Sequence, residues 1–537
     1  MAPVVHPRIR PGALEDRQYQ ADIARAALGR NTLAVLPTGL GKTAIALRLM
    51  AEMLDRHPDR GVLFLAPTRP LVVQHARSVE EAIVGPAPRV LTGTVAPGRR
   101  AEEEEAGEAE IVVATPQVIA NDLARGAFRL DRLSLIVVDE AHRAVGDYPY
   151  VAIGRANAVG PRARVLAMTA SPGSQKARIA AVWYNLGLEH FEYRTERSPD
   201  VAPYLHGVGV TTVEVPFPAE IQHVATLLRT VVARAVQRIP SELLPPGEVG
   251  RRSLLLAGER LHGALAAYRA RGEPVPPGLW ASVTAQSVAM KGLHALELAE
   301  SQGVDALRAF LSRQELARGK ALTPAQRAFL GDPDVVRVRE LLADGRLSEH
   351  PKLATAARIV REELTQRPAS RVLVFSQYRD TVDRLVEELR RDGDGRVRPA
   401  RFVGQAAHGG EAGLSQREQV RLLDEFRRGE VNCLVATSVA EEGLDIPSTD
   451  LVVLYEPIPD VVRTIQRRGR TGRARTGRAV VLVARGTRDE AMLRASSARE
   501  RRMHAMLEEV EEEARAGRLR PPSPTTAQRL LEEFEDA

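Results

Sequence analysis

The sequence predicts an α/β protein with two doubly wound parallel sheets and an all-helical domain inserted between them. Short apolar runs, rich in β-branched residues and without alternation, occur in two clusters, as is typical of strands buried on both faces. Segments with helical spacing separate the runs within each cluster, which indicates parallel strands joined by helices. From about residue 216 to 347 only helical spacing occurs. We therefore expect two sheet domains at 1–213 and 348–487, a helical insert at 214–347 and a helical tail at 488–537.

The composition is that of a soluble globular protein of several domains. A chain of 537 residues is too long for one core, and 44% hydrophobic and 27% charged residues are ordinary values. The net charge of +6 suits a polyanionic partner. Cys433 is the single cysteine, so no disulfide can form within the chain, and a buried thiol in a reducing compartment is expected. No run approaches about 20 apolar residues, so we expect a cytoplasmic protein without a membrane span.

The first strand of the first cluster leads into a phosphate-binding loop. Residues 33–36 are apolar, Pro37-Thr-Gly-Leu-Gly-Lys-Thr43 follows, and residues 44–50 have helical spacing. Backbone N–H groups of such a loop and of the next helix attract an anion. Lys42 can reach the β- and γ-phosphates of ATP, and the Thr43 hydroxyl can bind Mg²⁺. Leu36 stands where the generic pattern has its first glycine, and a glycine-rich turn without a ligand is the alternative.

The remaining strands of this cluster end in polar residues. We expect strands at 61–67, 110–116, 133–139 and 164–169, and helices at 14–28, 70–82 and 117–124. Ligands bind at the carboxyl ends of parallel strands. Asp139 is placed there to hold Mg²⁺ opposite Thr43, and Glu140 to orient and deprotonate the attacking water. A surface turn with an acidic pair is the alternative.

Other strand ends suggest contacts to a nucleic-acid strand. Thr68, Arg69 and Thr115 can contact phosphates of a strand lying across the domain. Gln74 and His75 follow on the next helix, where a solvated position is the alternative. The hydroxyls of Thr169-Ala-Ser171 can relay between the ATP site and a second domain, and a helix cap is the alternative for Ser171.

The second half of the chain contains the insert and the second sheet. Helices are expected at 219–237, 252–270, 279–299 and 304–316, and strands at 371–375, 401–403, 432–437, 450–455 and 479–484. Gln466-Arg-Arg-Gly-Arg-Thr-Gly-Arg473 has four Arg and two Gly residues within seven positions. A planar guanidinium that reaches a γ-phosphate from another domain stabilises the transition state. A basic surface loop is the alternative. Asp445 can accept from a ribose hydroxyl or from one of these Arg residues.

With these motifs in this order, the chain resembles a superfamily 2 helicase with paired RecA-like domains. Within that superfamily it most resembles the archaeal Hef helicase domain and its FANCM-type relatives. The segments that carry the narrower resemblance are Met168-Thr-Ala-Ser-Pro-Gly173, Val374-Phe-Ser-Gln-Tyr-Arg-Asp380, Phe402-Val-Gly-Gln405, Gly413-Leu-Ser-Gln416 and Gly486-Thr-Arg-Asp-Glu-Ala491.

The resemblance implies roles at the matching positions. It implies catalytic roles for Lys42, Asp139, Glu140, Gln466, Arg470 and Arg473, the last two as arginine fingers. It implies nucleotide binding by Arg17, Gln20, Thr38, Gly39, Gly41, Lys42, Thr43, Gly443, Asp445 and Arg467, with Gln20 and Arg17 at the adenine. It implies strand contacts by Thr68, Arg69, Thr115, Ser376, Gln377, Gln405 and Thr437.

The implied activity is ATP- and Mg²⁺-dependent unwinding of DNA from the 3′ side, at forks or branched junctions, in repair or replication restart near the nucleoid. Hef also has a C-terminal nuclease, whereas this sequence continues only as a charged helix, so a separate nuclease is an expected partner. Two alternatives stay open. One is a double-stranded RNA translocase like the RIG-I or Dicer helicases, and the other is a nucleic-acid clamp that hydrolyses no ATP.

Overall fold

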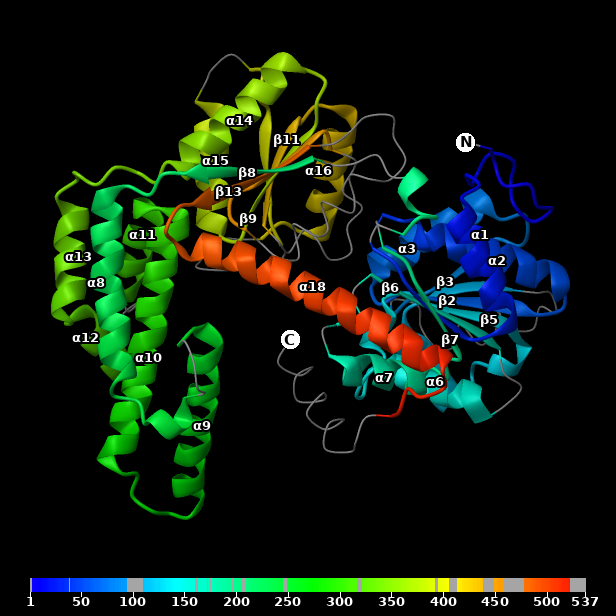
Figure 1. The fold of residues 1–537 in the computed structure, drawn as a ribbon, viewed down its shortest axis with the longest axis horizontal. Helices are drawn as coiled ribbons and strands as arrows, with labels where there is room; N and C mark the ends of the chain where they lie inside the picture. Colours follow the sequence, from blue (N-terminus) through cyan, green and yellow to red (C-terminus); the bar gives the residue numbers. More distant parts are fainter. Residues whose placement is uncertain are drawn as a thin grey trace.

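The computed structural model describes residues 2–37, 39–93, 110–159, 163–170, 172–173, 175–195, 198–204, 209–244, 249–315, 321–391, 395–404, 413–437, 449–457 and 478–521. Figure 1 shows two sheets with helices on their faces, a helical domain beside the second sheet, and the long helix α18 between the two sheet domains. This arrangement confirms the predicted α/β class. Within the described residues, no helix combines the length and apolarity that a membrane span needs.

The first sheet has seven parallel strands in the order β3-β4-β2-β5-β6-β1-β7. Its central strands are buried at every position, as their unbroken apolar sequences require. The strands are β1 (Thr32–Val35), β2 (Gly61–Leu65), β3 (Arg89–Leu91), β4 (Ile111–Ala114), β5 (Leu133–Val138), β6 (Arg164–Thr169) and β7 (His190–Tyr193). Strands β3 and β7 lie at the two edges, and neither was predicted from the sequence.

Helices cover both faces of this sheet. The first three pack on one face around Tyr19, Phe64 and Val79, and the next three pack on the other around Ile119, Tyr150 and Trp183. They are α1 (Gln18–Gly29), α2 (Lys42–Arg56), α3 (Arg69–Ala82), α5 (Pro116–Ala124), α6 (Pro149–Val159) and α7 (Lys176–Asn185). Short 3₁₀ turns are η1 (Leu130–Arg132), η2 (Ala141–Arg143) and η3 (Ala202–Tyr204).

The insert is helical, as predicted, with a core of its own around Leu228, Ala289 and Phe329. Its elements are α8 (Ala219–Val236), η4 (Ser241–Leu243), α9 (Arg251–Ala270), α10 (Pro277–Glu297), the π-helical turn η5 (Leu298–Gln302), α11 (Val304–Glu315), α12 (Pro324–Leu330) and α13 (Pro333–Ala343). Helices α9 and α10 extend away from both sheets (Figure 1).

The second sheet has six parallel strands in the order β10-β11-β9-β12-β13-β8. They are β8 (Gly209–Val215), β9 (Val372–Ser376), β10 (Pro399–Phe402), β11 (Cys433–Thr437), β12 (Leu451–Leu454) and β13 (Arg478–Ala484), with α14 (Lys352–Gln366), α15 (Arg379–Arg390) and α16 (Gln416–Arg428) on the faces. Strand β8 pairs with β13 along its whole length. The expected boundary after residue 213 therefore cuts a strand, and residues 209–213 belong to the second sheet. The other boundaries stay predictions.

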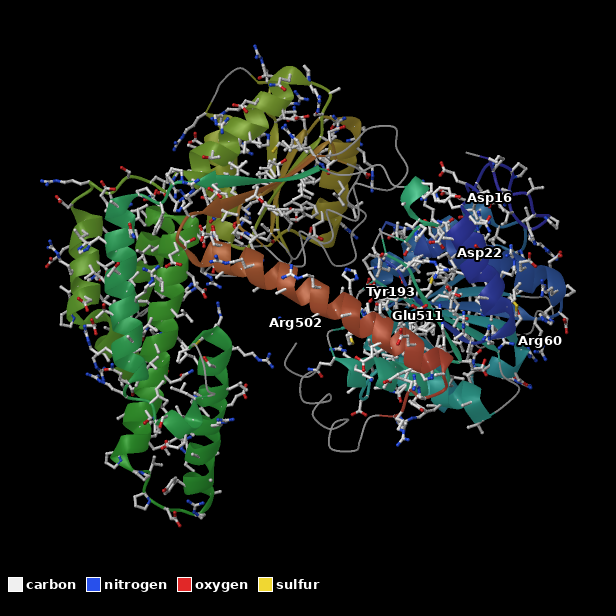
Figure 2. All side chains as sticks on the ribbon, viewed as in Figure 1. Asp16, Asp22, Arg60, Tyr193, Arg502 and Glu511 are labelled. Atoms are coloured by element: carbon white, nitrogen blue, oxygen red, sulfur yellow. The ribbon has the colours of Figure 1, made fainter. Side chains whose placement is uncertain are left out.

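Helix α18 (Arg488–Arg515) connects the two sheet domains. At its start, Asp489 forms a fully buried ion pair with Lys352 of α14. Further along, Leu507 and Val510 enter the core of the first domain. Lys176 Nζ lies 2.7 Å from Glu509 Oε1 and 2.6 Å from Glu513 Oε1. Figure 2 shows Arg502 and Glu511 along this helix as it reaches the first domain.

Candidate ATP and nucleic-acid sites

The phosphate loop joins β1 to α2 with the backbone that the motif requires. Gly39 and Gly41 have φ values of 93° and 72°, in the left-handed region that favours glycine. A Cβ atom at Gly41 would lie 2.5 Å from Gln20 Nε2, so a side chain there would displace Gln20. Lys42 opens α2, whose N-terminal N–H groups favour an anion. The loop geometry thus suits a phosphate group; Thr38 lies outside the described residues.

Helix α1 supports this loop through two buried side chains. Gln20 Nε2 donates to Leu40 O at 3.2 Å, and Tyr19 Oη donates to the same carbonyl at 2.7 Å. Gln20 is buried, and Arg17, also buried, pairs with Glu15 at 2.8 Å. Their polar groups contact protein in this structure. The expected contacts of Gln20 and Arg17 with adenine therefore stay a prediction.

Asp139 follows β5 and is held from three sides. His75 Nε2 lies 2.9 Å from Asp139 Oδ2, and the backbone N–H of Glu140 donates to Oδ1 at 3.0 Å. Tyr150 Oη donates to the Asp139 carbonyl at 2.7 Å. Burial opposes ionisation of this carboxyl, but the hydrogen bond from His75 and the positive charge of Lys42 favour the ionised form and lower the pKa of Asp139. An ionised carboxylate therefore stands near the Lys42 ammonium at the edge of the sheet.

Glu140 has an unusual backbone conformation. Its φ of 49° is the only positive value of a non-glycine among the residues that the structure describes, and such a conformation costs about 1–2 kcal/mol. The turn brings Glu140 Oε2 to 3.2 Å from His142 Nδ1, and the same nitrogen lies 3.0 Å from Thr169 Oγ1. The acidic motif after β5 is thus connected through His142 to the hydroxyl at the end of β6.

The donor set at this edge fits a magnesium ion bound together with nucleotide. Thr43 and Asp139 offer hard oxygen ligands, and Mg²⁺ is usually held by one or two carboxylates with substrate phosphates and water. Across the described ranges, no group of three or more His, Cys, Asp or Glu side chains could hold a metal by itself. Phosphate oxygens and water would complete the coordination.

Three expected strand contacts of the first domain lie near the same edge of the sheet. Thr68 and Thr115 follow β2 and β4, which are neighbouring strands, and Arg69 is exposed at the start of α3. Thr68 Oγ1 is buried and has no hydrogen-bond partner among the described residues. Thr437 Oγ1, at the end of β11 in the second sheet, is also buried without a hydrogen-bond partner among the described residues.

Ser376, an expected strand contact, has a buried side chain in this structure, and its role stays a prediction. Ser376 is fully buried, and its Oγ lies 3.3 Å from both carboxylate oxygens of Glu456. Glu456 also accepts from the backbone N–H of Gln377, whose side chain is exposed. Burial raises the pKa of Glu456 to about 7. On the neighbouring helix α15, Thr381 Oγ1 donates to Gln302 Oε1 of η5 at 2.6 Å, so a buried hydrogen bond joins the second sheet domain to the insert.

The second half of the expected nucleotide site lies outside the described residues. This concerns Gly443, Asp445, Gln466, Arg467, Arg470 and Arg473, and also Gln405 of the strand-binding set. Their roles stay predictions.

Reasoning from the sequence missed two residues that contact expected site residues, His75 beside Asp139 and Glu456 beside Ser376. His75 was given a solvated position as its alternative, yet it is buried against Asp139. The buried positions Val72, His75, Ala76 and Val79 have the spacing of one helix face, and this pattern could have located it. No sequence signal singled out Glu456.

Comparisons with known proteins identify helicases as similar to this chain. A family model of DEAD/DEAH box helicases matches residues 17–179, and a model of the helicase conserved C-terminal domain matches residues 355–475. A Methanocaldococcus jannaschii protein, provisionally named as an ATP-dependent RNA helicase, is 36% identical over 511 residues, or 94% of this chain and 62% of that protein. The ATP-dependent DNA helicase mph1 of Aspergillus niger is 33% identical over 503 residues, or 89% of this chain and 44% of that protein.

A solved structure is similar over almost its whole length. The crystal structure of the Pyrococcus furiosus Hef helicase domain is 40% identical with a TM-score of 0.71, and the match covers 90% of this chain and 98% of that one. This chain therefore spans less than two thirds of the two relatives named above and nearly all of the solved helicase domain.

Proposed function

We infer the function of this chain from its family: it belongs to the superfamily 2 helicases, together with the archaeal Hef helicase domain and the FANCM-type DNA helicases. We propose that it is an ATP-dependent DNA helicase that moves 3′ to 5′ and unwinds or remodels forks and junctions in repair or replication restart. A cytoplasmic, nucleoid-associated location and a separate nuclease partner belong to the same proposal.

The observation that carries the proposal is that Lys42, at the start of α2 after β1, and Asp139, directly after β5, both lie at the carboxyl edge of the first sheet. The phosphate loop and α2 would bind the phosphates, and Lys42 would contact the β- and γ-phosphates. Thr43 and Asp139 would hold Mg²⁺, which when bound supplies charge neutralisation at the phosphates. Glu140 would orient the attacking water and accept its proton.

Contacts to DNA would be made mainly to phosphates. Thr68, Arg69 and Thr115 lie at strand ends on the edge that also carries the ATP site, and Thr437 offers an equivalent position in the second sheet. A buried hydroxyl without a partner costs about 1–3 kcal/mol, and a bound phosphate would satisfy Thr68 and Thr437. Binding by phosphate contacts is weakly sequence-specific and decreases steeply with salt.

The ATPase rate against different nucleic acids tests this proposal. We expect stronger stimulation by forked DNA and four-way junctions than by a single strand, and little by duplex RNA. Lys42→Ala should lose the stimulated activity. If Lys42→Ala kept the wild-type ATPase rate, the role of Lys42 would be refuted. If the wild-type chain bound DNA but hydrolysed no ATP with any of these nucleic acids, a clamp without hydrolysis would replace the motor.

A double-stranded RNA translocase is the second candidate, because one relative carries the name of an RNA helicase. The same assay separates the two, since the RNA candidate requires duplex RNA to stimulate more strongly than any DNA. A clear preference for RNA would therefore refute the DNA proposal while leaving the ATP site intact.

A further inference from the structure

His75 contacts Asp139 of the expected nucleotide site from helix α3. It is 5% exposed, and its Nε2 is 2.9 Å from Asp139 Oδ2. The Phe64 ring packs against the imidazole with a centroid distance of 4.4 Å. The ring is therefore fixed by packing on one side and by the carboxylate on the other.

The hydrogen bonding of His75 assigns the tautomer. Nδ1 is buried and has no hydrogen-bond partner within the described part of the chain. A hydrogen on Nδ1 would be a buried donor without an acceptor, which costs about 1–3 kcal/mol. The hydrogen therefore resides on Nε2, and Nε2–H donates to Asp139.

The hydrogen bond from His75 restricts the rotation of the Asp139 carboxylate, and a metal ligand needs a fixed orientation. Asp139 Oδ1 already accepts from the N–H of Glu140, and His75 adds a bond to Oδ2. With both oxygens held, the plane of the carboxylate is fixed, while each oxygen keeps a lone pair for another partner.

We propose that His75 is a positioning residue for Asp139, and that it fixes this carboxylate in the orientation in which Asp139 binds nucleotide-bound Mg²⁺. The inference rests on the proposed function, since it requires the Mg²⁺ site. Partners that orient a metal ligand typically contribute 10- to 100-fold to metal affinity or activity. His75 has no direct contact with nucleotide in this proposal, so nucleotide binding without Mg²⁺ should not depend on it.

The test measures equilibrium binding of a fluorescent, non-hydrolysable ATP analogue to the full chain, across Mg²⁺ concentrations and in EDTA. His75→Leu removes the donor and keeps a buried apolar side chain, and His75→Gln offers an amide donor of similar reach. For His75→Leu we expect the Mg²⁺ concentration of half-maximal effect to rise about 10- to 100-fold, with unchanged affinity in EDTA. His75→Gln should restore most of the wild-type response.

Two controls separate positioning from general support of the fold. Val73→Ala shortens an exposed side chain on the same helix as His75, so its Mg²⁺ response should equal wild type. In an Asp139→Asn background, His75→Leu should cause no further change in that response. If His75→Leu fails to fold, His75→Phe, which lacks the donor but keeps an aromatic ring against Phe64, replaces it in both backgrounds.

The outcomes distinguish the two proposals. If the wild type binds the analogue without any Mg²⁺ dependence, the Mg²⁺ site and the role of His75 are both refuted. If the wild type depends on Mg²⁺ and His75→Leu has the same dependence, only the role of His75 is refuted. Equal losses with Mg²⁺ and in EDTA would also overturn it, because they indicate a structural role.

Discussion

Removal of one partner of the ion pair between Lys352 and Asp489 should strongly destabilise the second sheet domain. Both side chains have zero exposure, and they join the first turns of α14 and α18. Asp489 also accepts from Ser301 Oγ at 2.9 Å and from the Ala484 N–H at 3.0 Å. The change to make is Lys352→Met, which keeps the stem of the side chain and leaves the carboxylate buried without its cation.

The expected loss follows from that buried charge. Removing one partner of a buried ion pair costs about 3–5 kcal/mol, since the remaining ion is neither solvated nor paired. For a unit of roughly 150–250 residues, 1 kcal/mol corresponds to about 2–4 °C, so the melting temperature should fall by roughly 10 °C. Calorimetry of the full chain, with circular dichroism as a second probe, measures this shift.

Two further variants make the reasoning refutable. Lys352→Met with Asp489→Asn removes both charges and keeps an acceptor for Ala484, so it should recover most of the loss. Arg358→Met breaks an exposed pair with Glu362 on the same helix and should change the stability by less than about 1 kcal/mol. If Lys352→Met melted no lower than Arg358→Met, the argument from burial would be wrong.

Three other perturbations have definite expected results. Glu140→Gln should bind ATP and DNA but lose hydrolysis about 10²- to 10⁴-fold, and normal turnover would refute its role as the base. Lys176→Ala removes the contacts with Glu509 and Glu513, so hydrogen exchange should rise in the last turns of α18 and not in its first. Glu456 has its pKa raised from 4.5 to about 7, so its stabilising contribution is present below pH 4.5 and is lost as the pH rises through 7. Glu456→Gln should therefore gain stability relative to wild type from about pH 4.5 to 7, measured by urea unfolding, and a constant difference would contradict this.

Most strands could be predicted because a strand buried on both faces has a local signature. The missed strands β3, β7 and β8 lie at sheet edges, where one side of the backbone is unpaired and burial is incomplete. In β7, for example, burial alternates between neighbouring residues, so no continuous apolar run marks it. Edge strands of this kind resemble loops in the sequence.

The site was predictable where its parts are contiguous in sequence. Lys42, Asp139 and Glu140 belong to local motifs whose chemistry is readable from spacing. The contact between His75 and Asp139 joins residues 64 positions apart, and only the packing of α3 on the sheet brings them together. The burial of Ser376 depends likewise on Glu456, which is 80 positions away.

Strand β8 precedes the insert and helix α14 follows it, so the chain enters and leaves the insert from the second sheet domain. A rotation of that domain relative to the first would move the insert, which lies beside it (Figure 1), by the same angle. Helix α10 has 21 residues and is thus about 30 Å long, so a rotation of about 10° would displace its far end by roughly 5 Å. That travel exceeds the rise of about 3.4 Å between neighbouring nucleotides of one strand.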